Sequence, residues 1–287
     1  MHTNRFTSAI DTITGTVAVD AGSDDEPLRI LLTNDDGWDA PGLVMLAEAL
    51  RSAGHDVTVV APAANRSGAS ANVSFIGTLA VTRHDERTFA VHGTPVEAVS
   101  FGLDVVFAGD APDLVISGAN DGENVGAMVL YSGTVAAAAA ALNAGVPAIA
   151  VSSEFDLETF TVDHRPTVAA VVELVTALGR RRIDGAVLPA GVGINLNHPR
   201  SSAGEDPEVE VTRTGRGWFA LEYHLDELPA PGTTTEANVG FRLDVPEPLD
   251  GADTTALAAG RISVAVLHPG MDRPPVGLVG PHEAAVA

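Results

Sequence analysis

The sequence contains no cysteine and no lysine among its 287 residues. The lack of cysteine excludes disulfide bonds, thiolate catalysis and cysteine-ligated zinc, so any metal would be held by oxygen atoms or by imidazole. The sixteen basic residues are all arginine and face thirty-eight acidic residues, which gives a formal net charge of −22. This charge disfavours nucleic acid and anionic membranes as partners, although a charge of this size also serves solubility alone.

Long apolar runs are also missing. A transmembrane helix needs about 20 consecutive apolar residues, and the alanine-rich segment after Thr134 ends at Asn143 and Gly145. Residues 1–27 lack the charged start and continuous apolar stretch of a secretory signal. We therefore expect a soluble cytoplasmic protein with no membrane partner, in which residues 1–27 form a flexible N-terminal extension.

From Leu28 onward, short β-rich runs alternate with helical segments. The pattern predicts strands at 28–33, 56–62, 79–83, 88–93, 112–118 and 147–152, and helices at 41–54, 95–107, 132–145 and 163–180. Such alternation is typical of an α/β fold with a mostly parallel sheet and flanking helices.

Beyond about residue 200 the pattern weakens. β-like pieces at 208–214, 218–224 and 260–269 are separated by the Pro- and Thr-rich stretch 228–238. We interpret them as C-terminal β-hairpin excursions of one domain that spans residues 28–287, used for self-association.

Two neighbouring carboxylates, Asp35 and Asp36, follow the first predicted strand and precede Gly37. Open α/β sheets bind ligands beyond the carboxyl ends of their strands, and paired carboxylates repel unless a cation or proton lies between them. With oxygen donors nearby, Mg²⁺ or Mn²⁺ would suit the site. A solvated turn explains the same residues, since Asn, Asp and Gly are common in turns. Polar loops that follow three other strands, at 65–70, 118–120 and 152–153, favour one shared site.

Ser132 precedes a predicted helix whose first residues are Gly133 and Thr134. A helix N-terminus with exposed amides can receive a phosphate, and an ordinary serine N-cap gives the same pattern. Next to a predicted metal site, the combination points to phosphoryl chemistry.

Six motifs occur in order between Leu28 and Ser152: "ILLTNDDGWDAPG", "VVAPAANRSGAS", "HGTPVEAV", "DLVISGANDGENVG", "YSGTVAAA" and "GVPAIAVS". In this order and spacing they resemble the SurE family of metal-dependent 5′-nucleotidases, with weaker echoes in "GINLNHP" and "DTTALAAGRISVAVLHP". The resemblance implies a Rossmann-like α/β core, a divalent-metal site, phosphatase activity on nucleoside monophosphates, and a homodimer or homotetramer.

The resemblance also implies roles for individual residues. The implied metal ligands are Asp35, Asp36, Ser67 and Asn120; the implied catalytic residues are Asp35, Asp36 and Asn124; the implied phosphate-binding residues are Ser132, Gly133 and Thr134. Glu123 departs from the family pattern, which usually has a small residue or proline there, and would repel phosphate or bias the metal. Trp38 is a variable position that could shape a base or sugar pocket.

Other residues are interpreted structurally. His92, His198 and His268 each lie near a β-rich run, and a histidine could act as an acid or base, but nothing links them to the motifs. Residues 180–182, three consecutive arginines at a helix end, favour a contact with the helix dipole and a solvated face.

The sequence thus predicts a metal-dependent phosphomonoesterase that acts on nucleoside 5′- or 3′-monophosphates. Direct attack by water is expected, with an aspartyl-phosphate formed on Asp35 or Asp36 as the alternative. A non-catalytic nucleotide or metal sensor and a nucleotide-sugar transferase are the other classes considered. The transferase would require a second nucleotide-binding domain.

Overall fold

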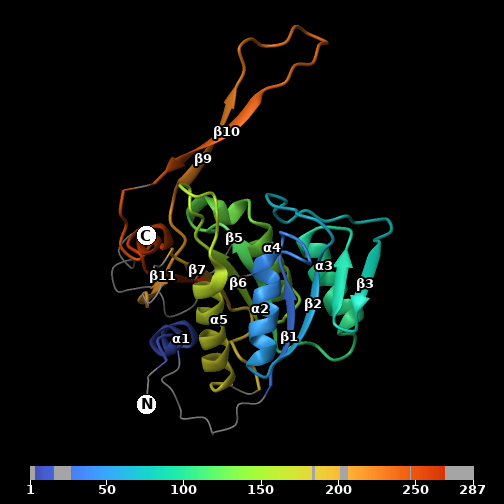
Figure 1. Cartoon of the computed structure of the whole chain (residues 1–287), viewed down its shortest axis with the longest axis vertical. Helices are drawn as coiled ribbons and strands as arrows, with labels where there is room; N and C mark the ends of the chain where they lie inside the picture. Colours follow the sequence, from blue (N-terminus) through green and yellow to red (C-terminus); the bar gives the residue numbers. More distant parts are fainter. Residues whose placement is uncertain (1–3, 16–26, 183–184, 201–205, 246, 269–287) are drawn as a thin grey trace, which may run out of the picture.

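The computed structural model describes residues 4–15, 27–182, 185–200, 206–245 and 247–268. A nine-stranded sheet forms the centre of the molecule, with strand order β3-β4-β2-β1-β5-β6-β7-β11-β8, and helices cover both of its faces (Figure 1). The strands are β1 Arg29–Thr33, β2 Asp56–Pro62, β3 Val81–Asp85, β4 Thr88–Val91, β5 Leu114–Asp121, β6 Ala148–Ser153, β7 Gly193–His198, β8 Val209–Thr212, β9 Trp218–His224, β10 Asn238–Asp244 and β11 Ile262–Leu267. The helices are α1 Thr7–Thr14, α2 Pro41–Ser52, α3 Pro95–Phe101, α4 Gly133–Asn143, α5 His164–Gly179 and α6 Asp253–Ala258, with a π-helical turn at Gly102–Val106 and a 3₁₀ turn at Gly126–Leu130.

The run from β4 through β2, β1, β5 and β6 to β7 is parallel, which confirms the predicted α/β class. β3 pairs antiparallel with β4, and β11 pairs antiparallel with β7. The chain passes from β1 to β2 on one side and later returns to place β5 on the other side of β1. Such a reversal opens a crevice at the carboxyl ends of β1 and β5, where open α/β sheets bind ligands.

Two apolar cores lie on opposite faces of the sheet. The first contains buried side chains of α2 and α5, and the second contains the helical residues 95–107 and the alanine-rich α4. β1 is buried on both faces, which explains why its apolar run does not alternate. The small side chains of Ala137, Ala138 and Ala141 are completely buried, so α4 packs closely on β5 and β6. No helix in the described ranges is long and apolar enough to cross a membrane.

The C-terminal part contributes to the central sheet as well as to a hairpin. β9 and β10 form a separate antiparallel pair that projects away from the body of the molecule (Figure 1). The expected hairpin excursion is therefore present at 218–244. The expectation is wrong for β8 and β11, which pair with each other and extend the central sheet through β7. The sequence patterns did not predict β7, β10 or α6.

Residues near the N-terminus pack against the body of the protein. Phe6 and Ile10 are buried in the same core as α2 and α5, and Asp11 forms an ion pair of 2.6 Å with Arg181. The expected flexible extension is therefore wrong for residues 4–15, because their apolar side chains complete the core; residues 16–26 lie outside the described residues. Arg182 forms an ion pair with Asp113, so the arginine run is not simply a solvated face.

Candidate active site

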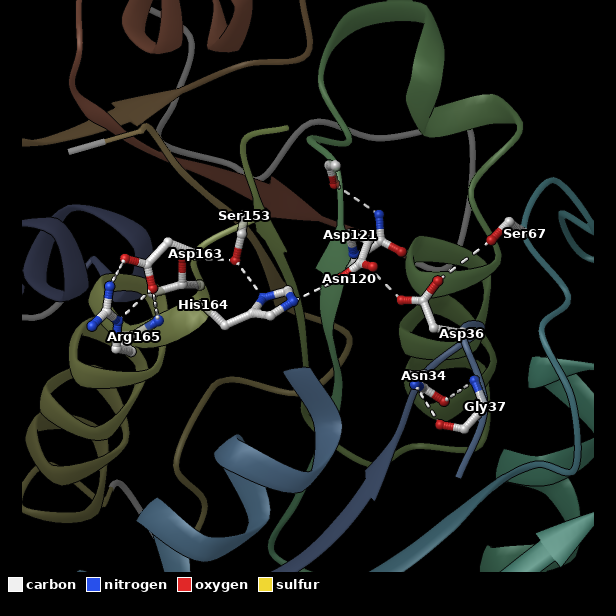
Figure 2. A network of polar contacts seen from close by, with 12 residues as sticks. Asn34, Asp36, Gly37, Ser67, Asn120, Asp121, Ser153, Asp163, His164 and Arg165 are labelled. Atoms are coloured by element: carbon white, nitrogen blue, oxygen red, sulfur yellow. Dashed lines mark hydrogen bonds and ion pairs between the residues drawn. The ribbon is translucent and has the colours of Figure 1, made fainter. Parts of the chain in front are cut away.

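The chain turns directly after β1. The side-chain amide of Asn34 donates to the carbonyl of Gly37 at 2.8 Å, and the Gly37 amide donates back to Asn34 Oδ1 at 3.2 Å (Figure 2). Gly37 has a φ of +122°, a conformation that other residues rarely adopt. This turn gives the side chains of Asp35 and Asp36 different environments at the end of one strand.

Asp35 is buried against the N-terminus of α4. The Thr134 hydroxyl donates to Asp35 Oδ1 at 2.5 Å. Burial raises the pKa of Asp35 above its ordinary value, although the Thr134 hydroxyl and the amides of Gly133 and Thr134 lower it. A Cβ atom at Gly133 would lie 2.7 Å from Asp35 Cβ, so only glycine permits this approach. The first turn of α4 therefore holds Asp35 in place.

Asp36 is less deeply buried than Asp35 and lies within reach of the charges of two other carboxylates, Asp35 and Asp121. Its Oδ2 accepts from the Asp121 amide at 3.3 Å, and its Oδ1 accepts from the Ser67 hydroxyl at 3.4 Å (Figure 2). Burial, followed by repulsion from the charges of Asp35 and Asp121, raises the pKa of Asp36 to about 6. A cation beside Asp36 would relieve this repulsion.

Asn120 lies near Asp35 and Ser67, at the carboxyl end of β5. Ser117 is opposite Ala150 and Asn120 is opposite Ser152, so β5 has one more residue than β6 between these pairs. Such a bulge redirects the side chains that follow it. The Asn120 side-chain amide donates to the Gly122 carbonyl at 2.7 Å, which leaves its carbonyl oxygen as an acceptor for another group.

The four predicted metal ligands lie near one another at the crevice between β1 and β5. A cavity of about 320 Å³ beside them is lined by Asp35, Ser67, Asn120, Asn124 and Ser132, among others. In the described part of the chain, no three His, Asp or Glu side chains are grouped to hold a metal ion. The predicted set instead combines two carboxylates with hydroxyl and amide oxygens, and this hard-oxygen donor set fits Mg²⁺ or Mn²⁺.

Asn124 is buried in a network of polar side chains. Its amide N–H donates to Asn197 Oδ1 at 2.7 Å, its side chain donates to Ser152 Oγ at 2.9 Å, and its carbonyl accepts from Asn195 Nδ2 at 2.9 Å. These partners lie on β6 and β7, so the loop after β5 is fixed to two neighbouring strands. Asn124 also lines the cavity, and its catalytic role stays a prediction.

The predicted phosphate-binding residues divide into two groups. Ser132 lines the cavity, while its hydroxyl caps α4 by accepting from the Val135 amide at 3.0 Å. Gly133 and Thr134 face Asp35 instead. The N-cap interpretation of Ser132 is therefore confirmed, and the phosphate role of all three residues stays a prediction.

Comparisons with known proteins relate the chain as a whole to one family. The family model described as "Survival protein SurE" matches residues 30–220. A protein of Rhodopseudomonas palustris named "5'-nucleotidase SurE" is 38% identical over 246 residues, which cover 84% of this chain and 93% of the relative. A protein of the same name from Xanthomonas campestris is 37% identical and covers 86% of this chain and 92% of the relative. This chain belongs to the SurE family.

A solved member of the SurE family has the same fold. The crystal structure of the SurE protein from Aquifex aeolicus superposes with a TM-score of 0.71 at 30% identity, covering 84% of this chain and 94% of that chain. The predicted family resemblance is thereby confirmed over most of the chain. It extends beyond Ser152, where the sequence motifs had become weak.

Two residues that depart from the SurE pattern have local explanations. The Glu123 carboxylate accepts from the Phe155 amide at 3.0 Å and from the Trp218 indole N–H, so this charge is engaged at the base of the hairpin. Trp38 stacks on His84 with ring centroids 3.6 Å apart, and it is not among the residues that line the 320 Å³ cavity. Trp38 therefore links the turn that follows β1 to strand β3.

Asp121 is supported by contacts that the sequence does not predict. The buried His164 contacts Asp121 Oδ1 through Nε2 at 2.7 Å and Ser153 Oγ through Nδ1 at 3.0 Å (Figure 2). Asp121 in turn donates its amide to Asp36. His164 is the first residue of α5, far from Asp121 in the sequence, and no local signal connects the two.

The histidines interpreted as structural all have hydrogen-bonding contacts within the protein. His92 contacts the Thr82 hydroxyl at 3.1 Å, His198 donates to the Pro199 carbonyl at 2.8 Å, and His268 donates to the Gly191 carbonyl at 3.2 Å. Burial lowers the pKa of His198, which favours its neutral form. None of the three lines the cavity next to Asp35.

Proposed function

We propose that this chain is a metal-dependent phosphomonoesterase that hydrolyses nucleoside 5′-monophosphates to nucleoside and phosphate. The observation that carries the proposal is the pairing of Asp35 and Asp36 at the crevice between β1 and β5, with Ser67 and Asn120 nearby. The relatives named 5′-nucleotidase SurE support the same reaction. Nucleoside 3′-monophosphates are a second substrate class to test.

Asp35, Asp36, Ser67 and Asn120 would hold one Mg²⁺ or Mn²⁺ ion. When bound, the ion would neutralise charge on the phosphate and lower the pKa of a water molecule. Thr134 orients Asp35 through its hydroxyl, and the Asp121 amide and Ser67 orient Asp36. These contacts fix the carboxylates before the substrate arrives, which is the main requirement for electrostatic catalysis of phosphoryl transfer.

Direct attack by water suits these residues better than an aspartyl-phosphate. Asp35 is buried and accepts a short hydrogen bond from Thr134, so its Oδ1 is already engaged. Ser132 and Asn124 line the cavity and offer polar groups to the phosphate oxygens. In this proposal Asn124 positions the phosphate, and Asp35 and Asp36 both hold the cation, which leaves neither carboxylate to attack the phosphorus.

The fold favours the nucleotidase over the alternatives considered. A nucleotide-sugar transferase would need a second nucleotide-binding domain, but β8 and β11 belong to the same central sheet. A non-catalytic sensor was suggested by the charge of Glu123, and that carboxylate is engaged by Phe155 and Trp218. The cytoplasmic location and the homodimer or homotetramer stay predictions.

The test is a phosphate-release assay on a panel of nucleoside 5′- and 3′-monophosphates and p-nitrophenyl phosphate, with Mg²⁺, Mn²⁺ or EDTA. We expect release from nucleoside 5′-monophosphates with a divalent ion and none with EDTA. Asp36→Asn should lower the release on the order of 10³-fold, whereas the matched control Asp39→Asn changes an exposed neighbouring carboxylate and should retain it. Absence of metal-dependent release from every substrate would contradict the proposal.

A further inference from the structure

A separate cavity lies at the carboxyl ends of β6 and β7. Ser153, the last residue of β6, is paired in register with His198, the last residue of β7, so the two side chains lie on the same side of the sheet. Both line a cavity of about 360 Å³, which we call the β6–β7 cavity. It shares no lining residue with the 320 Å³ cavity beside Asp35. Its volume lies within the range of about 300–1,000 Å³ that is usual for small-molecule pockets.

Part of the cavity wall consists of polar side chains that are almost fully buried. Ser153, Thr167 and His198 line the cavity and are each 2% exposed or less. Ser153 Oγ contacts Thr167 Oγ1 at 2.8 Å and His164 Nδ1 at 3.0 Å, and Ser153 lies on the far side of His164 from Asp36 (Figure 2). Because burial of a polar group is unfavourable unless the group has a partner, such a wall is typical of a polar binding site.

His198 has a ring nitrogen that its protein neighbours do not use. Nδ1 donates to the Pro199 carbonyl at 2.8 Å, and no hydrogen bond among the described residues engages Nε2. Burial lowers the pKa of His198, so the ring is neutral and Nε2 carries a free lone pair. Arg5 and Asp206, whose charges also act on His198, form an ion pair with each other and offset one another. A donor in the cavity would therefore satisfy Nε2.

The charged side chains around the cavity are mostly acidic. Glu154, Asp156 and Asp163 line it, and Arg200 is the one guanidinium among the described residues that do so. Arg200 forms an ion pair of 2.8 Å with Asp156, so its charge is already used. Asp163 pairs with Arg165 at 2.7 Å. Glu154 is the lining carboxylate that forms no ion pair in the described part of the chain.

The surroundings of Glu154 favour a cation. Its Oε2 accepts from the Arg200 amide at 2.8 Å, which leaves Oε1 as an acceptor for another group. Burial raises the pKa of Glu154, and the charges of Glu123 and Asp156 add to the rise. The N-terminus of α5 also adjoins the cavity and contributes about half a positive charge, less than the excess of carboxylates over guanidinium in the lining. A cation beside Glu154 would relieve the repulsion.

We propose that the β6–β7 cavity binds a small organic cation with several N–H donors, of the diamine or polyamine class. An ammonium group of the ligand donates to the Glu154 carboxylate and to His198 Nε2, which are both open acceptors. A metal ion fits less well, because no three His, Asp or Glu side chains are grouped to hold one in the described ranges. The acidic lining disfavours phosphate, and the net charge of −22 attracts cations to the protein. This site does not depend on the proposed nucleotidase activity.

The experiment is calorimetric titration of 1,4-diaminobutane into the metal-free full chain. About 150 mM NaCl screens loose attraction of the diamine to the acidic surface. The comparison ligands are 1,4-butanediol, which has the same length but no charge, and inorganic phosphate. We expect one diamine per chain and no binding of the diol or of phosphate. Absence of saturable diamine binding, or binding of phosphate in its place, would overturn the inference.

Three variants locate the bound diamine. Glu154→Gln keeps the shape of the side chain but removes its charge, and should weaken binding about tenfold. Glu158→Gln makes the same change in an exposed carboxylate outside the cavity and should bind like the wild type, as should Asp36→Asn. Equal affinity in Glu154→Gln and the wild type, or loss of binding in Asp36→Asn, would overturn the site. If Glu154→Gln does not fold, the ¹⁵N signal of His198 Nε2 in the wild type decides, since it should move on saturation with the diamine and an unmoved signal would contradict the proposal.

Discussion

The strand ends of the central sheet and the β9–β10 hairpin are held in place differently. At the strand ends Asn34, Asp35 and Asn124 are almost fully buried and have partners on several elements. On the hairpin Tyr223, Val239 and Phe241 are all more than half exposed. The base of the hairpin is tied to the body by the Trp218 indole and by the Gly217 carbonyl, which accepts from the Ala127 amide at 3.0 Å.

The strand ends and the hairpin therefore differ in how strongly a substitution disturbs the fold and the candidate site. Groups that must act on the phosphate lie on the rigid strands, where burial holds them and raises the pKa of Asp35 and Asp36. Most side chains of the hairpin are exposed or only partly buried, so a change of side chain there disturbs little of the fold. Substitutions in the two regions should therefore have effects of different size and kind.

The largest effect is expected for Asp36→Asn. The amide keeps the shape of the side chain but removes the charge that would hold the cation, so kcat should fall on the order of 10³-fold on every substrate, as expected for the several kcal/mol that a metal contributes. Steady-state kinetics with Mn²⁺ measures the change. Retention of more than a tenth of the activity would contradict this expectation, since the strand ends would then be no more sensitive to substitution than the hairpin.

The next largest effect is expected on the pH dependence of the free energy of unfolding in metal-free buffer. The pKa of Asp36 rises from 3.8 to about 6 on folding, so the folded state keeps its proton to higher pH than the unfolded state. This contribution is fully present below pH 3.8 and is lost as pH rises through 6. The free energy of unfolding should fall by up to about 3 kcal/mol between pH 4 and pH 7 on this account.

Urea unfolding in EDTA at a series of pH values measures this loss. Asp35 and Asp253 also have raised pKa values, so they too make the free energy of unfolding fall as pH rises. The contribution of Asp36 is therefore measured as the difference between the wild type and Asp36→Asn. The variant should show a shallower fall with pH. Parallel curves for the two proteins would contradict the assigned pKa of Asp36.

A smaller effect is expected for Thr134→Val, which keeps the volume of the side chain but removes the hydroxyl that donates to Asp35. Loss of a partner behind a metal ligand typically costs 10- to 100-fold in metal affinity or activity, and we expect about tenfold. Thr134→Ser restores the hydroxyl and should recover most of the activity. Equal losses in the valine and serine variants would show that packing, and not the hydrogen bond, explains the effect.

The smallest effect is expected on the hairpin. Phe241→Ala removes an exposed ring from a cavity of about 370 Å³ that adjoins the candidate active site, so kcat/KM for adenosine 5′-monophosphate should fall about threefold to fivefold, while the free energy of unfolding changes by less than about 0.5 kcal/mol. Kinetics and urea unfolding measure the two quantities. A loss of more than 1 kcal/mol in stability would show that the hairpin is structurally coupled to the core.

Much of the fold could be predicted from local patterns in the sequence. The apolar run of β1, the spacing of Val168, Val171 and Val175 in α5, and Ser132 at the start of α4 each carry a signal over a few residues. The packing of α1 could not be predicted, since Phe6 and Ile10 lie in a short segment whose burial depends on α5 and the sheet. β7 was missed because "GINLNH" alternates apolar and asparagine side chains that are all buried.

The candidate site was predictable as a set of residues but not as a set of contacts. The position of Asp35 and Asp36 after β1 follows from the motif, whereas the Thr134 hydroxyl reaches Asp35 across 99 residues. The same holds for Glu123, whose carboxylate accepts from the Trp218 indole N–H, 95 residues away in the sequence. Contacts between residues so far apart depend on the completed fold, and a single sequence does not reveal them.

The most direct test of the metal site is calorimetric titration of Mn²⁺ into the wild type, Asp36→Asn and Asp39→Asn after treatment with EDTA. Our account predicts one bound ion per chain in the wild type and in Asp39→Asn, and loss of this binding in Asp36→Asn. Unchanged binding in Asp36→Asn, or no binding to the wild type, would contradict the claim that the ends of β1 and β5 hold the catalytic metal.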